Sequence, residues 1–350
     1  MKQNSLIKVK IRNYPMKYLV VSAFFCLLLH HKQLNNNRIM NKAISKENAI
    51  VAYKAFGNNF SCRDFQYEVG KEYHINGDIE VCKKGFHACI DLMDVFNYYS
   101  MSNSRFAIMK MWGDVLFDID KICASNIEIV EELSLKDIVE RYASSKLDFM
   151  NKTYYHCTIL KNFEKESYTN GDGNHIISNY NRKKILSKGA LNTIISNDVS
   201  NTIFDLGDFS TINCNDIGTR LVSIGCNKNI TLMGSSTAVL YGDKNTITGL
   251  SGTSVIVSNG NDCTINLISN SAHCTTNGRN NKINVMGNNM IDSRGFGDEL
   301  ILNGNDITFR AKYGSAVTCM GKETMLVGDG SIKEDVWYRF ANGNIKYVKI

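Results

Sequence analysis

The feature that most constrains the fold is a phrase repeated through the second half of the chain: a glycine, four residues, then an aliphatic residue. It occurs eight times, and successive glycines lie 17 or 18 residues apart. A spacing this regular is the signature of a repeat architecture. The pairs are Gly171/Ile176, Gly189/Ile194, Gly207/Ile212, Gly225/Ile230, Gly242/Ile247, Gly260/Ile265, Gly278/Ile283 and Gly295/Leu300.

A fainter phrase lies halfway between these pairs. Ile203, Leu221, Val239, Ile256 and Cys274 each follow the isoleucine of a phrase by nine residues, so the unit is a nonapeptide and two units make one period. Nine residues allow one short strand and one tight turn, which Gly, Asn or Asp can form. Within a strand the isoleucine points inward and its Thr or Asn neighbours point outward, which is the period-two pattern of a half-buried strand.

This repeat predicts a parallel β-solenoid with a coil of about 18 residues, in which each isoleucine lies over its equivalent in the next coil. Coils would be spaced by roughly 4.8 Å. A three-sided coil stays open as an alternative. A helical array is excluded because Gly, Asn, Thr and Ser are poor helix formers, and a calcium-binding roll is excluded because the GGxGxD spacing is absent.

The chain is expected to contain four segments. In chain order we expect a basic and apolar extension, a small α/β globular domain, the β-solenoid and a C-terminal β cap. The fold class is therefore an α+β N-terminal domain followed by an all-β solenoid. The bounds of the four segments are 1–39, 40–168, 169–311 and 312–350.

The globular segment contains no repeat, and its local patterns predict individual elements. Stretches rich in β-branched and aromatic residues predict strands, and apolar residues at helical spacing predict helices, the second of them with Ser134 as its N-cap. The C-terminal segment is expected to end in a hairpin. The predicted strands cover 49–56, 64–75 and 104–119, the helices 91–100 and 134–150, and the hairpin 336–350.

The positive charge of the chain is concentrated at its N-terminus. The formal net charge is +6, but residues 1–39 hold seven basic and no acidic residues, which leaves 33 basic against 34 acidic. Nucleic acid is therefore not an expected partner. The apolar run 18–29 resembles a signal peptide and is too short for an ordinary membrane span. The alternative is an over-extended reading frame with the true start at Met40.

The cysteines indicate the cellular compartment. There are eleven, an odd number, and no CxxC motif occurs. Reduced and mostly buried thiols suit this pattern better than a disulfide framework. We therefore expect a cytoplasmic protein, with export as the alternative if residues 18–29 are a functional signal. No membrane association is expected unless that run is a real signal or anchor.

Several motifs in the globular segment carry a family resemblance. The order YKAF, CRDFQYEVGKEY, CKKGFHAC, FNYY and RFA resembles an uncharacterised domain family of bacterial and prophage proteins. In that family the block is often followed by short Gly/Asn/Ser-rich repeats. The resemblance implies a bacterial, prophage-related origin and brings no activity with it. The motifs occupy 53–56, 62–73, 82–89, 96–99 and 105–107.

Four residues of this block have side chains of the kind that bind zinc: Cys62, Cys82, His87 and Cys89. Their spacing, C-x4-H-x-C for the last three, is not that of a standard zinc module. Inert buried thiols and a structural histidine are the favoured interpretation, so neither a metal nor a cofactor is expected.

The same block also looks like a segment of ADP-ribosyltransferase-type folds, with GFHAC, a short helix and then the strand RFAIMKM. This resemblance implies a nicotinamide pocket lined by His87, Arg63, Tyr98 and Tyr99. No motif places the glutamate that such enzymes often need, and Glu128, Glu131 and Glu132 are only downstream candidates. A packed aromatic core is the simpler interpretation of these residues.

Two functions therefore stay open, and whether the protein is an enzyme is undecided from sequence. The first is a non-enzymatic binding or structural protein with a β-solenoid scaffold, for which the family resemblance implies a phage-related origin. In this case the Thr/Asn face would bind a protein or a carbohydrate, and homo-oligomers are a further possibility. The second is an NAD-dependent ADP-ribosyltransferase-like enzyme with its site in residues 50–110.

Overall fold

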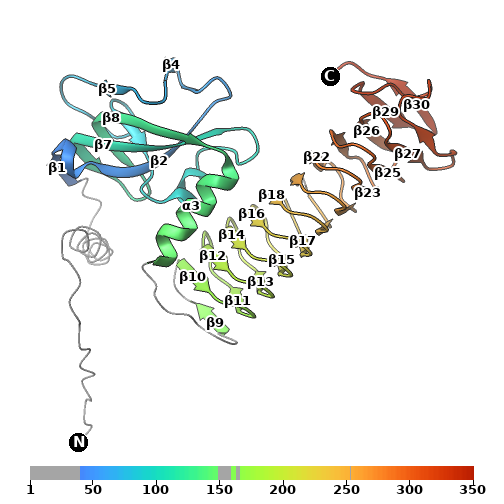
Figure 1. Ribbon diagram of the computed structural model, residues 1–350, viewed down its shortest axis with the longest axis horizontal. Coiled ribbons are helices and arrows are strands. Elements are labelled where there is room, and N and C mark those ends of the chain that lie inside the picture. The colour runs from blue at the N-terminus through green and yellow to red at the C-terminus, as the bar shows by residue number, and fades with distance from the viewer. Residues whose placement is uncertain (1–39, 149–158, 163–165, 253) are drawn as a thin grey trace, which may run out of the picture.

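The chain folds into a sheet-rich N-terminal domain beside a long solenoid that ends in a C-terminal hairpin (Figure 1). The computed structural model describes residues 40–148, 159–162, 166–252 and 254–350. The predictions for the signal-like run and for the extension 1–39 lie outside the described residues. No helix within the described ranges is long and apolar enough to cross a membrane.

The N-terminal domain is built on a six-stranded antiparallel sheet of order β1-β7-β8-β5, with β2 paired to β7 and β6 paired to β8. Methionines, aliphatic residues and aromatic rings fill the core on this sheet. The elements are β1 (Met40–Ile44), η1 (Lys46–Asn48), β2 (Ile50–Phe56), β3 (Ser61–Cys62), β4 (Phe65–Gln66), β5 (Glu72–His74), β6 (Phe86–Ala88), α2 (Leu92–Val95), β7 (Arg105–Phe117), β8 (Ile122–Leu133) and α3 (Leu135–Asp148).

Most of the predicted local elements are present, and two are shorter than expected. Residues 104–119 form one long bulged strand, β7, and helix α3 begins after Ser134, whose hydroxyl accepts a hydrogen bond from the Asp137 backbone N–H at 3.2 Å. The stretch 64–75 forms only the short strands β4 and β5. The helix predicted over 91–100 is the single turn α2, capped by Asp91.

The solenoid places one strand of each coil in each of two long sheets, which the cap strands extend to eleven strands each. The first sheet contains β10 (Glu166–Asn170), β12 (Lys184–Lys188), β14 (Thr202–Leu206), β16 (Arg220–Ile224), β18 (Thr237–Tyr241), β20 (Val255–Asn259), β22 (His273–Thr276), β24 (Met290–Ser293) and β26 (Asp306–Arg310). The second contains β9 (Ile159–Asn162), β11 (His175–Ser178), β13 (Thr193–Ser196), β15 (Thr211–Cys214), β17 (Asn229–Leu232), β19 (Thr246–Gly249), β21 (Thr264–Leu267), β23 (Lys282–Val285), β25 (Glu299–Leu302) and β27 (Ala316–Cys319).

The predicted isoleucine ladder is confirmed by the strand register. Ile212 pairs with Ile230, and Ile230 with Ile247, in parallel strands 17 or 18 residues apart. All three are at most 2% exposed. Because each coil contributes one strand to each of only two sheets, the coil is two-sided, and the three-sided alternative is wrong.

Buried asparagines hold the turns of successive coils together. The side-chain oxygen of Asn192 accepts the backbone N–H of Asn174 at 2.8 Å, and Asn245 accepts that of Lys228 at 2.9 Å. Asn201, Asn281 and Asn289 make the same contact one coil back. These bonds satisfy backbone donors that the tight turn would otherwise leave buried without a partner.

The turns of the solenoid include non-glycine residues with a left-handed backbone, and Phe209 is one of them. Phe209 has a φ of 59° and its side chain is 54% exposed, whereas the equivalent residue of the next coil is Asn227, with a φ of 57°. Asparagine tolerates the left-handed region and a large aromatic residue does not. Phe209→Asn should therefore raise the free energy of unfolding by about 1 kcal/mol, measured by urea denaturation. A lower free energy of unfolding in the variant would contradict this account of the turn.

The N-terminal domain packs on the outer face of the first solenoid sheet. Outward residues of four successive strands, Leu186, Phe204, Val222 and Val239, are buried against α2 and α3. The ring of Phe204 contacts Tyr142 edge-on, at 5.9 Å between ring centroids. An apolar row on the outside of a solenoid thus attaches the domain along several coils.

Charged residues also join the two parts. The Lys184 ammonium of the solenoid lies 2.7 Å from the carboxylate of Asp94 in α2 and 3.4 Å from that of Asp91, the N-cap of α2. Asp91 additionally accepts the hydroxyl proton of Tyr142 at 2.9 Å. Partial burial raises the pKa of Asp94 to about 6, although Lys184 opposes the shift. The position of the domain is therefore held by both packing and charge.

The C-terminal segment closes the far end of the stack. Strand β29 (Tyr338–Ala341) pairs antiparallel with β26, and β30 (Asn344–Tyr347) with β29, which is the predicted hairpin. Strand β28 (Met325–Leu326) similarly follows β27 in the second sheet. The change from parallel to antiparallel pairing ends the repeat and covers sheet edges that would otherwise invite aggregation.

Candidate functional site

Three of the residues predicted as site candidates surround a buried lysine that the sequence did not single out. The Lys54 ammonium donates to the backbone carbonyl of His87 at 3.0 Å and to the Tyr99 hydroxyl at 3.3 Å. The Cys62 sulfur lies 3.4 Å from the same hydroxyl. Lys54 itself is 6% exposed. Strands β2, β3 and β6 and the chain after α2 thus bring these groups together.

Burial governs the electrostatics of this cluster. It lowers the pKa of Lys54, and the groups that oppose the shift are the thiols of Cys62 and Cys89. The ammonium also lies 5.6 Å from the ring centroids of Phe56 and of Tyr99, which stabilises a cation within an aromatic environment. The arrangement is that of a lysine packed into the domain core.

His87 is engaged in a structural contact. Its Nε2 accepts the backbone N–H of Cys82 at 2.8 Å. Burial, and then the positive charge of Lys54, lower the pKa of the imidazole. A neutral imidazole whose Nε2 lone pair already accepts a hydrogen bond cannot ligate a metal through that atom.

The two cysteines closest to His87 in the sequence, Cys82 and Cys89, lie in different environments. Cys89 is buried, and burial raises the pKa of its thiol to about 12, whereas Cys82 is exposed. Within the parts of the chain that the structure covers, no three His, Cys, Asp or Glu side chains are arranged to hold a metal ion.

Tyr98 and Arg63 form hydrogen bonds with groups other than Lys54 and Cys62, which are the partners of Tyr99. The Tyr98 hydroxyl donates to Asp120 at 2.6 Å, and its side chain is 48% exposed. Partial burial and that hydrogen bond raise the pKa of Tyr98 to about 12. Arg63 is exposed and reaches the Cys82 carbonyl at 3.4 Å.

The three glutamates considered as catalytic candidates all form ion pairs. On β8, Glu128 lies 3.8 Å from Lys110, Glu131 pairs with Arg141, and Glu132 lies 2.6 Å from Arg105. The Arg105 contact lowers the pKa of Glu132. A carboxylate held in an ion pair with a basic side chain is a poor general base.

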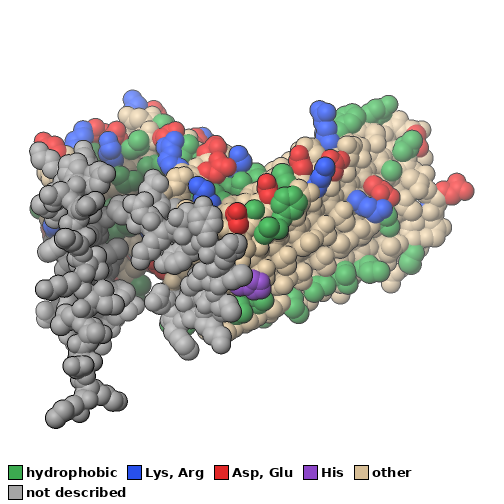
Figure 2. All heavy atoms as spheres, turned by 60° about the horizontal axis from the view of Figure 1, so that its bottom comes forward, with side chains coloured by type: hydrophobic (Ala, Val, Ile, Leu, Met, Phe, Trp, Pro, Cys, Tyr) green, Lys and Arg blue, Asp and Glu red, His purple; other side chains and the backbone are tan. Residues whose placement is uncertain are grey.

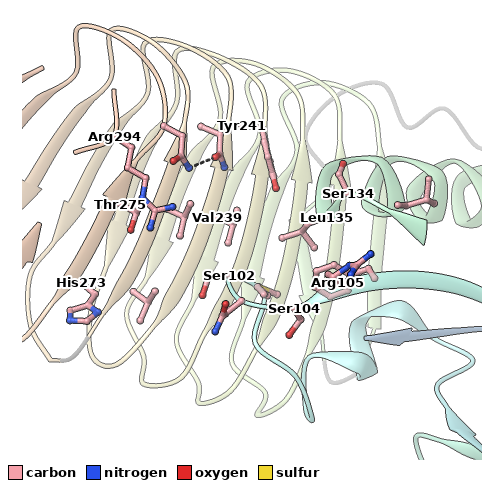
Figure 3. A pocket seen from close by; sticks show the side chains of 18 of the residues that line it. Ser102, Ser104, Arg105, Ser134, Leu135, Val239, Tyr241, His273, Thr275 and Arg294 are labelled. Atoms are coloured by element: carbon pink, nitrogen blue, oxygen red, sulfur yellow. Dashed lines mark hydrogen bonds between the residues drawn. The ribbon is translucent and has the colours of Figure 1, made fainter. Parts of the chain in front are cut away.

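A cleft lies where the N-terminal domain meets the solenoid (Figure 3). Its volume is about 690 Å³. The domain contributes the segments 101–106 and 132–135. The solenoid contributes outward residues of β18, β20 and β22, Asn277 after β22 and Arg294 after β24. Val255 and Val257 of β20, both half-buried, form an apolar floor next to Val239, which α2 and α3 already cover.

A second cleft of about 280 Å³ continues the first along the same sheet towards the C-terminal cap. The two share His273, Thr275 and Arg294. At its far end the guanidinium of Arg310 lies 4.8 Å from the ring centroid of Trp337. Together they form a groove along the outside of the solenoid, bounded by the domain at one end and by the cap at the other.

Most charges in the groove are already paired. Arg105 donates to both carboxylate oxygens of Glu132, at 2.6 and 2.7 Å. Arg294 and Arg310 both donate to Asp292. The other polar lining groups are hydroxyls, amides and the His273 imidazole. The groove is therefore better suited to a hydroxyl-rich ligand than to a highly charged one.

Residues 50–141 match a family described as "Domain of unknown function (DUF7666)". This match covers β2 to the middle of α3 and supports the resemblance to an uncharacterised domain family. The solenoid lies outside the matched residues. No curated protein and no solved structure matches the chain.

The groove was not predicted from the sequence, because it forms only where the N-terminal domain meets the solenoid. One feature of the sequence nevertheless indicates this face of the solenoid. In the fainter phrase the alternation of apolar and polar residues is replaced by three consecutive apolar residues, as in Ala238-Val239-Leu240 and Val255-Ile256-Val257. Consecutive apolar residues in a strand indicate that both of its faces are covered. That pattern identifies the face of the solenoid on which the N-terminal domain packs. It does not indicate at which coil the domain ends and the groove begins.

Proposed function

We propose that this protein is a non-enzymatic binding protein in which the solenoid is a rigid support and the groove beside the N-terminal domain binds an oligosaccharide. The observation that carries the proposal is the lining of the groove: an apolar floor bordered by hydroxyl, amide and imidazole side chains. This composition matches a sugar chain, which has apolar C–H faces and many hydroxyl groups.

The size and rigidity of the groove support this proposal. A volume of about 690 Å³ lies within the roughly 300–1,000 Å³ of typical small-molecule sites, and the second cleft extends it for a longer chain. Both walls are fixed, one by the strand ladder and the other by the packing of α2 and α3 on Phe204 and its neighbours. Preformed walls reduce the entropy lost when a flexible ligand binds.

The polar groups of the groove can discriminate between ligands that carry hydroxyl groups and ligands that lack them. The Asn277 side chain donates to Asn259 at 2.8 Å, and this bond orients both amides. Asn259 also donates to the Leu240 carbonyl at 3.1 Å, so its amide is held by both bonds. Asn277 is therefore the amide that can donate to one sugar hydroxyl and accept from another. Sites that hydrogen-bond ligand hydroxyls reject ligands lacking them, because their own polar groups would be left unpaired.

The NAD-dependent transferase is the less favoured function. Its candidate glutamates are held in ion pairs, and His87 is engaged with the Cys82 backbone. The transferase would be supported by transfer of label from labelled NAD to the protein or to an added acceptor.

Binding to a panel of neutral oligosaccharides, followed by calorimetry on the full chain, tests the proposal. Replacing His273 and Asn277 by alanine should weaken the affinity for a bound sugar about 10-fold, since each lost hydrogen bond is worth about 0.5–1.5 kcal/mol. Thr248→Ala, on the outer face of the second sheet, is the matched control and should leave affinity unchanged. Failure of every sugar to bind, or equal loss in the control, would refute the proposal.

A further inference from the structure

An exposed apolar ridge runs along one rim of the solenoid, on the turns that follow strands of the second sheet. Its members are Met233, Leu250, Ile268 and Met286, one from each of four successive coils, and they are 37–53% exposed. In Figure 2 apolar side chains follow the lower rim of the solenoid beside a largely uncharged face. These residues are not part of the interface with the N-terminal domain, which uses the first sheet.

The ridge has a fixed geometry. The backbone N–H of Leu250 donates to the Leu232 carbonyl at 2.9 Å, and that of Ile268 donates to the Gly249 carbonyl at 2.8 Å. Met233 and Met286 make equivalent bonds to the preceding coil. The four side chains therefore follow the spacing of the strand ladder, roughly 4.8 Å per coil.

The fold itself does not require apolar residues in this column. In the preceding coils the same positions are occupied by Asn179, Asn197 and Asn215, whose side chains bond to one another at 2.8 and 2.9 Å. A polar ladder thus satisfies this turn as well as an apolar one does. The change to Met, Leu, Ile and Met exposes apolar surface with no benefit to the coil, which is typical of an interaction site.

The surroundings of the ridge are uncharged. The outward row before it contains Thr231, Thr248, Asn266 and Asn284, and the residues after it are Gly234, Ser251, Ser269 and Gly287. A twofold contact brings identical surfaces together, so a charged patch would repel its own copy whereas an uncharged one does not.

We propose that this ridge, together with the Thr/Asn face beside it, is the surface through which two copies of the chain associate side by side. A second copy has a ridge of the same spacing, so the side chains of one can lie between those of the other along its whole length. Four side chains cover less than the roughly 800 Å² per partner of a standard interface. The Thr/Asn face must therefore contribute, and the dimer is weak.

Sedimentation equilibrium of the full chain tests this proposal. The average mass should rise from one chain towards two over roughly 1–100 µM protein. The double variant Ile268→Asn/Met286→Asn, which introduces the residue that the upstream coils carry in this column, should stay at one chain throughout, with an unchanged circular dichroism spectrum. Met286→Lys should also abolish association, because each copy would place a charge against the other.

Phe209→Asn is the matched control. It removes an exposed apolar side chain from the opposite rim of the same solenoid and should leave the mass curve unchanged. The proposal is overturned if the parent chain stays monomeric over the whole range, if the asparagine variant associates as the parent does, or if the control abolishes association equally.

Discussion

Lys228→Met is expected to lower the free energy of unfolding by about 3–5 kcal/mol. Lys228 and Asp205 form an ion pair inside the solenoid at 2.7 Å, and both side chains are completely buried. The ammonium also donates to the Ser223 hydroxyl and to the Ile224 carbonyl, both at 2.9 Å. Removing the cation leaves the Asp205 carboxylate buried without its counter-charge. Burial already raises the pKa of that carboxyl despite the adjacent lysine.

The matched variant is the double replacement Lys228→Met/Asp205→Leu. Replacing both charges by apolar groups removes the buried carboxylate as well, so most of the lost stability should return. Urea denaturation followed by circular dichroism measures all three proteins. If the single and double variants are equally destabilised, the loss comes from packing and not from the unpaired charge.

Gly260→Ala should destabilise the solenoid by about 3 kcal/mol or more. A Cβ atom at Gly260 would stand 1.8 Å from the carbonyl oxygen of Gly242 in the coil before it. Neither backbone can move away, because the strands on both sides are locked in the parallel ladder. The chain would have to break a rung to accommodate one methyl group.

Gly249→Ala is the control for this variant. An added Cβ there would meet Leu267 at 3.5 Å, an ordinary contact, and the glycine lies within strand β19. It should change stability by less than about 1 kcal/mol. Thermal unfolding of both variants distinguishes a clash at the turn from a general cost of replacing glycine. Equal losses would contradict the close-approach explanation.

The close contact at Gly260 also corrects the explanation given for the repeated glycines from the sequence. The repeated glycines were expected because turns need a conformation that other residues avoid, and Gly225 fits this with a φ of 136°. Gly260 has no such φ. It is required because the preceding coil approaches within a distance that only a hydrogen atom permits. One sequence signal therefore has two physical causes, and only the stacked coils distinguish them.

Less of the candidate site than of the solenoid could be predicted from the sequence. Cys62 was a candidate for a metal site and Tyr99 for a nicotinamide pocket, and neither hypothesis grouped these two residues. The residue that joins them, Lys54, is an ordinary lysine in a strand and carries no motif. Similarly, Lys228 and Asp205 lie 23 residues apart, and nothing in the local sequence pairs them. They meet only because the register sets one coil over the next.

The sequence alone determined the β-solenoid, its coil length and its isoleucine ladder. Each coil contacts chiefly its two neighbours, so the whole architecture follows from a short local pattern repeated at constant spacing. Only the tertiary structure decided where the N-terminal domain docks, and with it the groove between Arg105 and His273. The docking contacts join residues far apart in the chain, such as Lys184 and Asp94 at a separation of 90 positions, and no periodicity relates the two sides.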